Sequence, residues 1–393
     1  MPRTFPDWLA AYQRYADLHE CPTIFDLFAG LSGISAALGR KVWLPFGRYP
    51  IYPNLYVVLV SEPGGRKTTA LRGVKPIVRA IESVGGVNMV SQKVTLERLM
   101  QKFGKLGATI TLPSGEEYTH SSLHAFSDEL GVLVKKGDDA ALTVYTDWYD
   151  CDPYWVNDTK HQGVDVIPGV CFGMLAGTTP GWLGSAFPLA AMEEGFTTRV
   201  IFVCSNEKKR SDPMPLEAPP ELLKGLQDDL AHIATLAGPF AFTDDAYKWN
   251  AEWYEKHEAN KGMVDYRFRG YNARKQIHLL KIAMCLCTAR SDKLVLTAEL
   301  LQEALTVLEQ AETTMPDAFG STGRNSLAPV LVRMLALIRT RKRIRRTELV
   351  REFWREVNIK EMEEMLTVIQ AMGACRVTTN GKSTVYEVIE GGE

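Results

Sequence analysis

A glycine-rich turn between an apolar run and a helix-like segment is the part of this chain best suited to bind phosphate. The β-branched run 56–60 is followed by residues 61–66, called here the Gly-rich loop, and then by Lys67-Thr68-Thr69. Glycines allow backbone N–H groups to approach a phosphate, and the N-terminus of the next helix favours an anion. Lys67 would reach the outer phosphates, and the Thr68 hydroxyl would bind Mg²⁺. We therefore predict a site for ATP and Mg²⁺ that includes Pro63, Gly64, Gly65, Arg66, Lys67, Thr68 and Thr69.

The Gly-rich loop departs from the pattern G-x-x-x-x-G-K-[ST] at two positions. Ser61 replaces the first glycine of the pattern, and Arg66 replaces the last. The alternative is a glycine-rich turn that only carries a solvated lysine. The strand–loop–helix context favours the phosphate site, because each of the three parts has a role in binding the anion.

Two carboxylates follow the next strongly apolar run and could supply the hydrolytic chemistry. Residues 123–127 form a strand-like run that ends at Asp128 and Glu129, and Asp128 lies 61 residues after Lys67. Asp128 would orient the Mg²⁺ shell, and Glu129 would polarise the attacking water. Acidic pairs after strands are common, so this assignment depends on the Gly-rich loop that precedes them.

Two later strand-like runs carry further polar candidates at their ends. The run 170–177 leads into Thr178-Thr179-Pro180, where Thr178 or Thr179 would contact the terminal phosphate or would only form a turn. Arg199 precedes the run 200–203. An arginine at the rim of such a site can stabilise the γ-phosphate of a neighbouring subunit, as an arginine finger does. A surface arginine that caps a strand is the alternative.

Composition indicates a globular, intracellular chain of two or three domains. Its 393 residues are 46% hydrophobic and 23% charged, and the net charge is -2, so any contact with nucleic acid depends on local basic clusters. Seven cysteines without a C-x-x-C pair argue against a disulfide framework and a zinc site. No signal peptide or membrane span is expected, because glycines and prolines interrupt the one long uncharged stretch, residues 166–192. We expect a cytoplasmic protein.

Changes in pattern divide the chain into five segments. Residues 1–40 read as helical and amphipathic, and residues 41–205 alternate strands with helices and loops. Residues 206–220 are a Pro-rich linker, and residues 221–319 are helical in pattern. A Gly/Ser/Asn break then precedes the last unit, residues 326–390.

The last unit has the pattern of a winged helix, a variant of helix-turn-helix. We predict helices over residues 327–338, 347–357 and 359–372, followed by strands 375–379 and 384–389 that Asn380-Gly381 joins as a hairpin.

Six cations lie within eight residues of this unit. They could contact DNA phosphates. A solvated loop on a protein-docking module is the alternative, with equal weight. The candidates for DNA contact are Arg341, Lys342, Arg343, Arg345 and Arg346.

The order of these motifs resembles that of the AAA+ ATPases. With the helical region and the winged helix, the chain resembles the minichromosome-maintenance-like helicases, in which a non-Gly residue before the loop lysine is normal. Residues 43–71 and 178–183 also resemble a poorly characterised family of phage and mobile-element proteins that lie among replication genes. The resemblance covers about residues 25–310 and gives the motifs their specificity as a set.

Three further features fit this resemblance. Residues 109–119 and 154–166 read as hairpins, which in such helicases face the central pore. Lys160 and His161 at the second tip would then hold a phosphate of threaded DNA, unless they only form a solvated turn. Arg274 fits the arginine that the AAA+ lid directs at the nucleotide, with Lys275 and Lys281 as competitors and a surface arginine as the alternative.

Together these observations predict an α/β protein with a P-loop (AAA+) core, a helical N-terminal segment, a helical lid and a C-terminal winged helix. The predicted function is a ring-forming, hexameric, ATP-dependent DNA helicase of phage or mobile-element replication, with single-stranded DNA in its pore and other replication proteins as partners. An ATP-regulated replication initiator or helicase loader is the first alternative. A RecA-type core instead of AAA+ is the second, and a small-molecule kinase is a third and weaker one.

Overall fold

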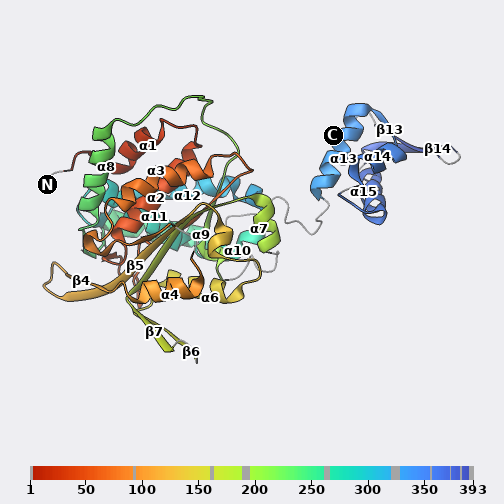
Figure 1. Ribbon diagram of the computed structural model, residues 1–393. Helices are drawn as coiled ribbons and strands as arrows, with labels where there is room; N and C mark the ends of the chain where they lie inside the picture. Colours follow the sequence, from red (N-terminus) through yellow and green to blue (C-terminus); the bar gives the residue numbers. More distant parts are fainter. Residues whose placement is uncertain are drawn as a thin grey trace. The chain divides into compact units, whose positions relative to one another are not determined.

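The computed structural model describes residues 3–91, 94–159, 163–187, 195–260, 266–319, 328–354, 356–371, 373–380 and 383–388. The chain forms two compact units, Met1–Phe319 and Gly320–Glu393 (Figure 1). The N-terminal helices, the strand-rich part and the helical region that follows all belong to the first unit.

The first unit is built on a central parallel sheet of strands β2 (Tyr56–Val60), β3 (Met89–Val90), β5 (Glu117–Ser127), β8 (Val170–Thr178) and β9 (Ile201–Cys204). Their order is β3-β5-β8-β2-β9, and β4 (Ala108–Thr111) adds to β5 in antiparallel fashion. Every residue of β2, β8 and β9 is buried, which explains their continuous apolar runs. The predicted α/β class is therefore confirmed.

Helices cover both faces of this sheet (Figure 1). Helices α2 (Thr23–Leu38) and α3 (Lys67–Arg79) pack on one face, and α4 (Leu96–Gly104) and α6 (Asp139–Asp150) pack on the other. Helices α1 (Trp8–Ala16) and α8 (Pro220–Ile233) form an outer layer over α2 and α3. The apolar side chains predicted for α1 are buried, and the Trp8 and Tyr12 rings stack with centroids 5.4 Å apart.

The region after the linker packs against the end of the sheet at β9. It contains α9 (Asp244–Asn260), α10 (Arg269–Ala273), α11 (Lys275–Arg290) and α12 (Ala298–Ala318), with α12 lying against β9. Two short strand pairs were not predicted from the sequence. The pairing of β1 (Val42–Trp43) with β10 (Gly238–Pro239) ties this region to the rest, and β11 (Ala241–Phe242) pairs with β12 (Val295–Leu296) within it.

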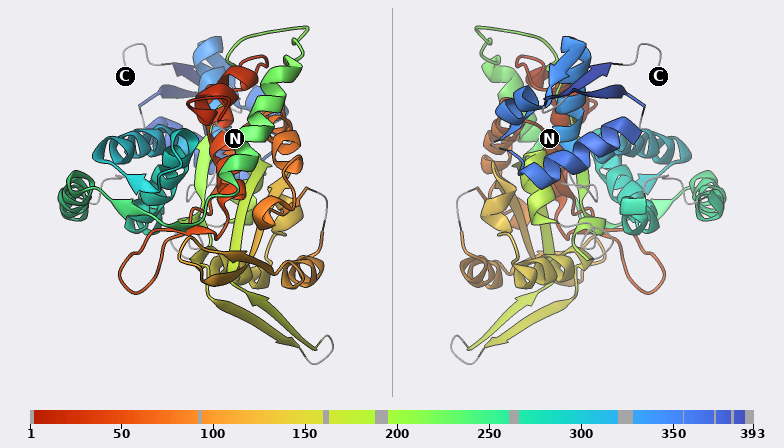
Figure 2. Two further views of the ribbon diagram at one scale, coloured as in Figure 1. Left: turned by 90° about the vertical axis from the view of Figure 1, so that its left-hand side faces the viewer. Right: turned by 90° about the vertical axis from the view of Figure 1, so that its right-hand side faces the viewer.

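Both predicted hairpins are present. The first is the pairing of β4 with the start of β5. The second consists of β6 (Tyr154–Thr159) and β7 (Gly163–Pro168), and it projects from the first unit in every view (Figures 1 and 2). Tyr154 and Val156 are exposed on this hairpin. Lys160 and His161 lie outside the described residues.

The second unit contains the predicted three helices and hairpin. They are α13 (Ala328–Arg341), α14 (Arg346–Phe353), α15 (Ile359–Ala371), β14 (Cys375–Asn380) and β15 (Ser383–Val388). A short strand that was not predicted, β13 (Arg343–Arg345), completes an antiparallel sheet of order β13-β15-β14. The unit has its own apolar core, which includes Met334, Ile338, Leu349 and Ile369. Among the described residues of both units, no helix is long and apolar enough to span a membrane.

Candidate functional site

Predicted site residues from three different strands meet at the carboxyl end of the sheet. Val60, the last residue of β2, pairs with Thr178 of β8, and the Ser61 N–H donates to the Thr178 carbonyl at 3.3 Å. Strand β5 ends beside β8, so that a Cβ at Gly177 would lie 2.7 Å from the Asp128 carbonyl oxygen. Gly177 therefore permits the close approach of Asp128. In open parallel α/β sheets, ligands bind at the carboxyl ends of the strands.

The Gly-rich loop is closely packed around Ser61. A Cβ at Gly65 would lie 2.2 Å from the Ser61 hydroxyl oxygen, so only glycine fits there. Gly64 has a φ of +88°, a conformation that glycine adopts without strain. The Glu62 N–H donates to the Asn206 side-chain oxygen at 3.0 Å, which fixes the loop to the segment after β9. Ser61 thus fills space beside the loop where the pattern has its first glycine.

Lys67 is the first residue of α3, and only 9% of it is exposed. Its ammonium group donates to the Ser61 carbonyl at 2.7 Å, the Ser61 hydroxyl at 2.9 Å and the Glu62 carbonyl at 3.2 Å. Burial lowers the pKa of Lys67, and the nearby charges of Glu129 and Glu62 oppose that shift. The ammonium is therefore directed into the Gly-rich loop, where phosphate oxygens could replace these acceptors.

Thr68 and Thr69 lie in the first turn of α3 and are partly buried. The N–H groups of Thr69 and Ala70 donate to the Arg66 carbonyl, at 3.0 and 3.3 Å. The first N–H groups of a helix have no carbonyl one turn earlier, so they carry a partial positive charge. This end of α3 suits a phosphate, and the Thr68 hydroxyl is positioned on the same turn.

The two carboxylates after β5 have different surroundings. Asp128 accepts from the Lys75 ammonium of α3 at 2.6 Å. Glu129 is exposed at the start of α5 (Leu130–Leu133), and the Ser127 hydroxyl donates to its carbonyl at 2.7 Å. Its carboxylate is near enough to Lys67 to counteract the lowering of the lysine pKa. A metal ion at Asp128 would therefore compete with Lys75, whereas the charge of Glu129 acts on the loop lysine.

Thr178 and Thr179 differ in their roles. Thr178 is the last residue of β8, lies between the loop strand β2 and the acidic strand β5, and is buried. The Thr179 hydroxyl accepts from the Trp182 N–H at 3.3 Å and so caps α7 (Pro180–Ala186). Thr178 is therefore the threonine whose position is central to the edge of the sheet.

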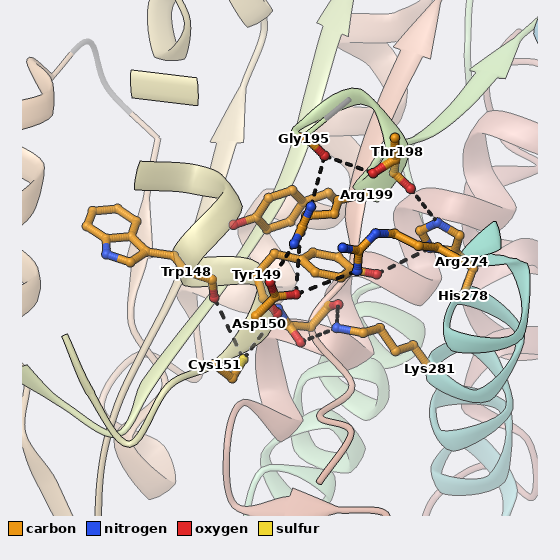
Figure 3. A network of polar contacts seen from close by, with 12 residues as sticks. Trp148, Tyr149, Asp150, Cys151, Gly195, Thr198, Arg199, Arg274, His278 and Lys281 are labelled. Carbon is orange, nitrogen blue, oxygen red and sulfur yellow. Dashed lines mark hydrogen bonds and ion pairs between the residues drawn. The ribbon is translucent and has the colours of Figure 1, made fainter. Parts of the chain in front are cut away.

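Arg199 lies at the amino end of β9, in a short 3₁₀ turn (Figure 3). Only 6% of it is exposed, so it is not a surface arginine. Its guanidinium donates to the Asp150 carboxylate at 2.5 and 3.4 Å and to the Gly195 carbonyl at 3.0 Å. The neighbouring Thr198 carbonyl is 3.1 Å from the His278 ring, which links this turn to α11.

Arg274, at the start of α11, lies in the same cluster (Figure 3). One of its terminal nitrogens is 3.8 Å from Asp150, and burial lowers the pKa of Arg274, an effect that Arg199 strengthens. Its competitors have other contacts: Lys275 binds Glu312 at 2.6 Å, and Lys281 binds the Asn54 side chain at 2.5 Å.

The two arginines lie at the opposite end of β2 from the Gly-rich loop. The Tyr149 ring, next to Asp150 in sequence, packs against Tyr56, the first residue of β2, with centroids 4.9 Å apart. The loop begins after Val60, the last residue of β2, and such a strand spans roughly 13 Å. Within one subunit, the fold therefore brings Arg199 and Arg274 together and separates both from Lys67. A cavity of about 420 Å³ opens beside them, with Asp150, Arg274 and Tyr149 in its wall.

Of the residues predicted to contact DNA, the structure describes those of the second unit. Arg343 and Arg345 are exposed and flank the buried Ile344 on β13, so they point to the same side. Arg343 pairs with Glu387 at 3.0 Å, and Arg346 pairs with Glu363. Arg341 and Lys342 are exposed. Part of the positive charge is therefore compensated within the unit.

Several residues beside the Gly-rich loop were not predicted from the sequence as site residues. Lys75 follows Lys67 by two turns of α3, and this helical spacing could have identified it. Asn206 comes two residues after the end of β9, and polar residues at the carboxyl ends of strands are candidates in any parallel sheet. Glu20, which binds Arg66, has no sequence signal of its own because it lies in a loop far from the motif.

The site fits Mg²⁺ only as a partner of bound phosphate. Among the described residues, no group of three or more His, Cys, Asp and Glu side chains could hold a metal ion. Mg²⁺ at nucleotide sites is held by one or two side chains together with the phosphates. No protein-family model and no curated protein matches this chain.

Proposed function

We propose that this protein is an ATP-dependent, ring-forming DNA helicase with an AAA+ type core, related to the minichromosome-maintenance-like helicases and acting in phage or mobile-element replication. The observation that carries the proposal is that Lys67, Thr178 and the Asp128–Glu129 pair lie together at the carboxyl ends of strands in a parallel sheet. A lysine directed into a Gly-rich loop after β2 and acidic groups after β5, with β8 between the two strands, are the parts that hydrolysis of a nucleoside triphosphate needs.

Each residue has a role in this proposal that follows from its position. Lys67 and the N-terminus of α3 would bind the phosphates, and Thr68 with Asp128 would hold Mg²⁺, which neutralises charge on the phosphates. Glu129, exposed and close to Lys67, would accept a proton from the attacking water. Thr178 would contact the terminal phosphate from β8.

The position of the two arginines supports a shared site between subunits. Arg199 and Arg274 lie beyond reach of the Gly-rich loop of their own chain, yet they form one cluster beside a cavity. In a ring, the amino ends of the strands in one subunit could face the nucleotide of the next subunit. We therefore propose a homo-oligomer, most simply a hexamer, in which these arginines complete the neighbour's site.

Contacts with DNA would come from two places. The β6–β7 hairpin projects from the first unit, and its tip carries Lys160 and His161 in the sequence (Figure 2). The second unit has the element order of a winged helix and exposes Arg343 and Arg345 on one side of β13. That unit has its own core, so it could bind DNA while the first unit does not move along it. A replication initiator that binds DNA in this way is the second candidate.

Imaging and unwinding assays separate the two candidates. Negative-stain images of the protein with Mg²⁺, a non-hydrolysable ATP analogue and single-stranded DNA should show closed rings with density in the pore. A forked DNA substrate should be unwound only when ATP can be hydrolysed. DNA-bound particles without rings, together with no unwinding, would favour the initiator, and failure to bind the analogue at all would reject both.

We expect Glu129→Gln to separate ATP binding from hydrolysis. The amide keeps the size of the side chain but cannot act as a base, so turnover should fall by about 100-fold or more while ATP affinity stays within about threefold. Asp128→Asn should instead raise the Mg²⁺ concentration that hydrolysis requires, because it removes the carboxylate proposed to hold Mg²⁺. Phosphate release and equilibrium binding of a fluorescent ATP analogue measure the two effects. Normal hydrolysis by Glu129→Gln, with an inactive Asp128→Asn, would show that their roles are misassigned.

A further inference from the structure

Three segments of the chain converge on the carboxylate of Glu20, beside the Gly-rich loop. Glu20 lies between α1 and α2, and its side chain is only 9% exposed. One carboxylate oxygen accepts from two nitrogens of the Arg66 guanidinium, at 2.9 and 2.6 Å, and lies 3.2 Å from the Lys208 ammonium. The other oxygen accepts from the Asp212 N–H at 2.7 Å. Glu20 therefore connects the N-terminal segment, the loop and the segment after β9.

Arg66 has a strained backbone at the junction between the loop and α3. Its φ is +64°, in the left-handed region that disfavours a side chain, and it directly precedes Lys67. Its carbonyl accepts the first hydrogen bonds of α3, from Thr69 and Ala70. Any change in the backbone of Arg66 would therefore reorient the N-terminus of α3 and the ammonium of Lys67. The surrounding structure must hold this conformation, because the residue itself does not favour it.

Glu20 is suited to hold Arg66 because it remains ionised. The Asp212 N–H, with the Arg66 and Lys208 cations, lowers the pKa of Glu20 to about 2. Two nitrogens of the Arg66 guanidinium donate to one oxygen of Glu20, and these charge-assisted hydrogen bonds also restrict the direction of the arginine side chain. The guanidinium is thereby held at Glu20, in the segment between α1 and α2. The Cys21 thiol, the next residue, donates weakly to the Arg66 carbonyl at 3.7 Å.

We propose that Glu20 is a positioning residue of the nucleotide site, which holds Arg66 and the start of α3 in the form that binds a triphosphate. The proposal rests on the proposed ATP site, and it adds a residue from outside every predicted motif. It also explains how the loop can carry an arginine where the pattern has glycine: the strain at Arg66 is offset by contacts that a glycine would not require.

A double-mutant cycle tests this role. Glu20→Gln should weaken binding of a fluorescent, non-hydrolysable Mg²⁺–ATP analogue by about tenfold, because one neutral amide oxygen cannot serve both Arg66 and the Asp212 N–H. In an Arg66→Gly background, the same Glu20→Gln change should alter affinity by less than twofold, since glycine adopts a positive φ unaided and has no guanidinium to hold. A merely structural role for Glu20 would produce the same loss in both backgrounds.

The controls keep the outcomes distinct. Glu303→Gln removes a comparable pair of contacts, to Arg290, on the exposed surface of α12 and should not change binding. If Glu20→Gln does not fold, as judged by its melting temperature, Arg66→Lys tests the same contact, because lysine keeps the charge but loses the two donating nitrogens of the guanidinium. It should weaken binding in the same direction.

Three results would overturn the proposal: wild-type affinity in Glu20→Gln, wild-type affinity in Arg66→Lys, or an equal loss on the Arg66→Gly background. A wild-type chain that does not bind the analogue would instead reject the nucleotide site itself.

Discussion

Replacement of Lys67 by alanine is expected to reduce DNA-stimulated ATP hydrolysis by at least about 100-fold, as loss of one well-placed charge donor does at other active sites. The ammonium of Lys67 is buried against the loop oxygens of Ser61 and Glu62, and no other described lysine donates to them. Without it, the charge on the outer phosphates has no partner from the loop. Phosphate release measured with and without single-stranded DNA tests the expectation.

The matched control is Lys224→Ala, which removes an exposed lysine from α8 that pairs with its helical neighbour Asp228. Its hydrolysis should equal that of the wild type. Both variants should retain the wild-type melting temperature within a few degrees. Substantial hydrolysis by Lys67→Ala would show that the Gly-rich loop is not the catalytic phosphate site, even if ATP binds elsewhere on the protein.

The second large effect is expected for Arg199→Ala, which should slow turnover by about 10³-fold and leave ATP affinity nearly unchanged. A cation supplied by a neighbour stabilises charge that develops only in the transition state, so its loss affects kcat rather than binding. Arg199 lies with Arg274 at the amino edge of the sheet, too far from Lys67 of the same chain to act within one subunit. Steady-state kinetics with the analogue-binding assay separates kcat from affinity.

Mixing two inactive variants tests whether the site is shared. Equal amounts of Arg199→Ala and Lys67→Ala subunits should recover part of the activity, because some interfaces then pair an intact loop with an intact arginine. Arg290→Ala, which removes another ion-paired arginine away from this cluster, should be fully active. A mixture as inactive as either parent, when subunits are shown to exchange, would contradict the shared site.

Arg199 is buried, so its removal could also destabilise the first unit, and Arg274→Ala provides an independent variant. The Arg274 side chain is 34% exposed and lies at the rim of the cluster, so its loss should be tolerated by the fold. If Arg274→Ala lowers turnover in the mixing test and Arg199→Ala does not, the finger is Arg274. Asp150 contacts both guanidiniums, and a neighbour's phosphate would have to compete with that carboxylate.

The local parts of the site could be predicted from the sequence. Residues 56–69 form a strand, a loop and a helix as expected, because apolar β-branched runs and glycine turns are decided by neighbouring residues. Asp128 and Glu129 follow a buried strand for the same reason, and β14 pairs with β15 as the predicted hairpin requires. The strands β1, β10, β11 and β12 were missed because two residues each are too short to show a period.

Only the tertiary structure decided which of these parts lie together. The resemblance implied that Arg274 is directed at a nucleotide, and only the fold shows that it lies with Arg199 and Asp150, at the end of the sheet opposite the Gly-rich loop. Glu20 and Arg66 are 46 residues apart, and Lys75 and Asp128 are 53 apart. Periodicity and turn chemistry act over a few residues and encode each element, but contacts between distant side chains depend on how the strands order themselves in the sheet. That order, β3-β5-β8-β2-β9, determines which strand ends are neighbours and therefore which charged side chains lie close together.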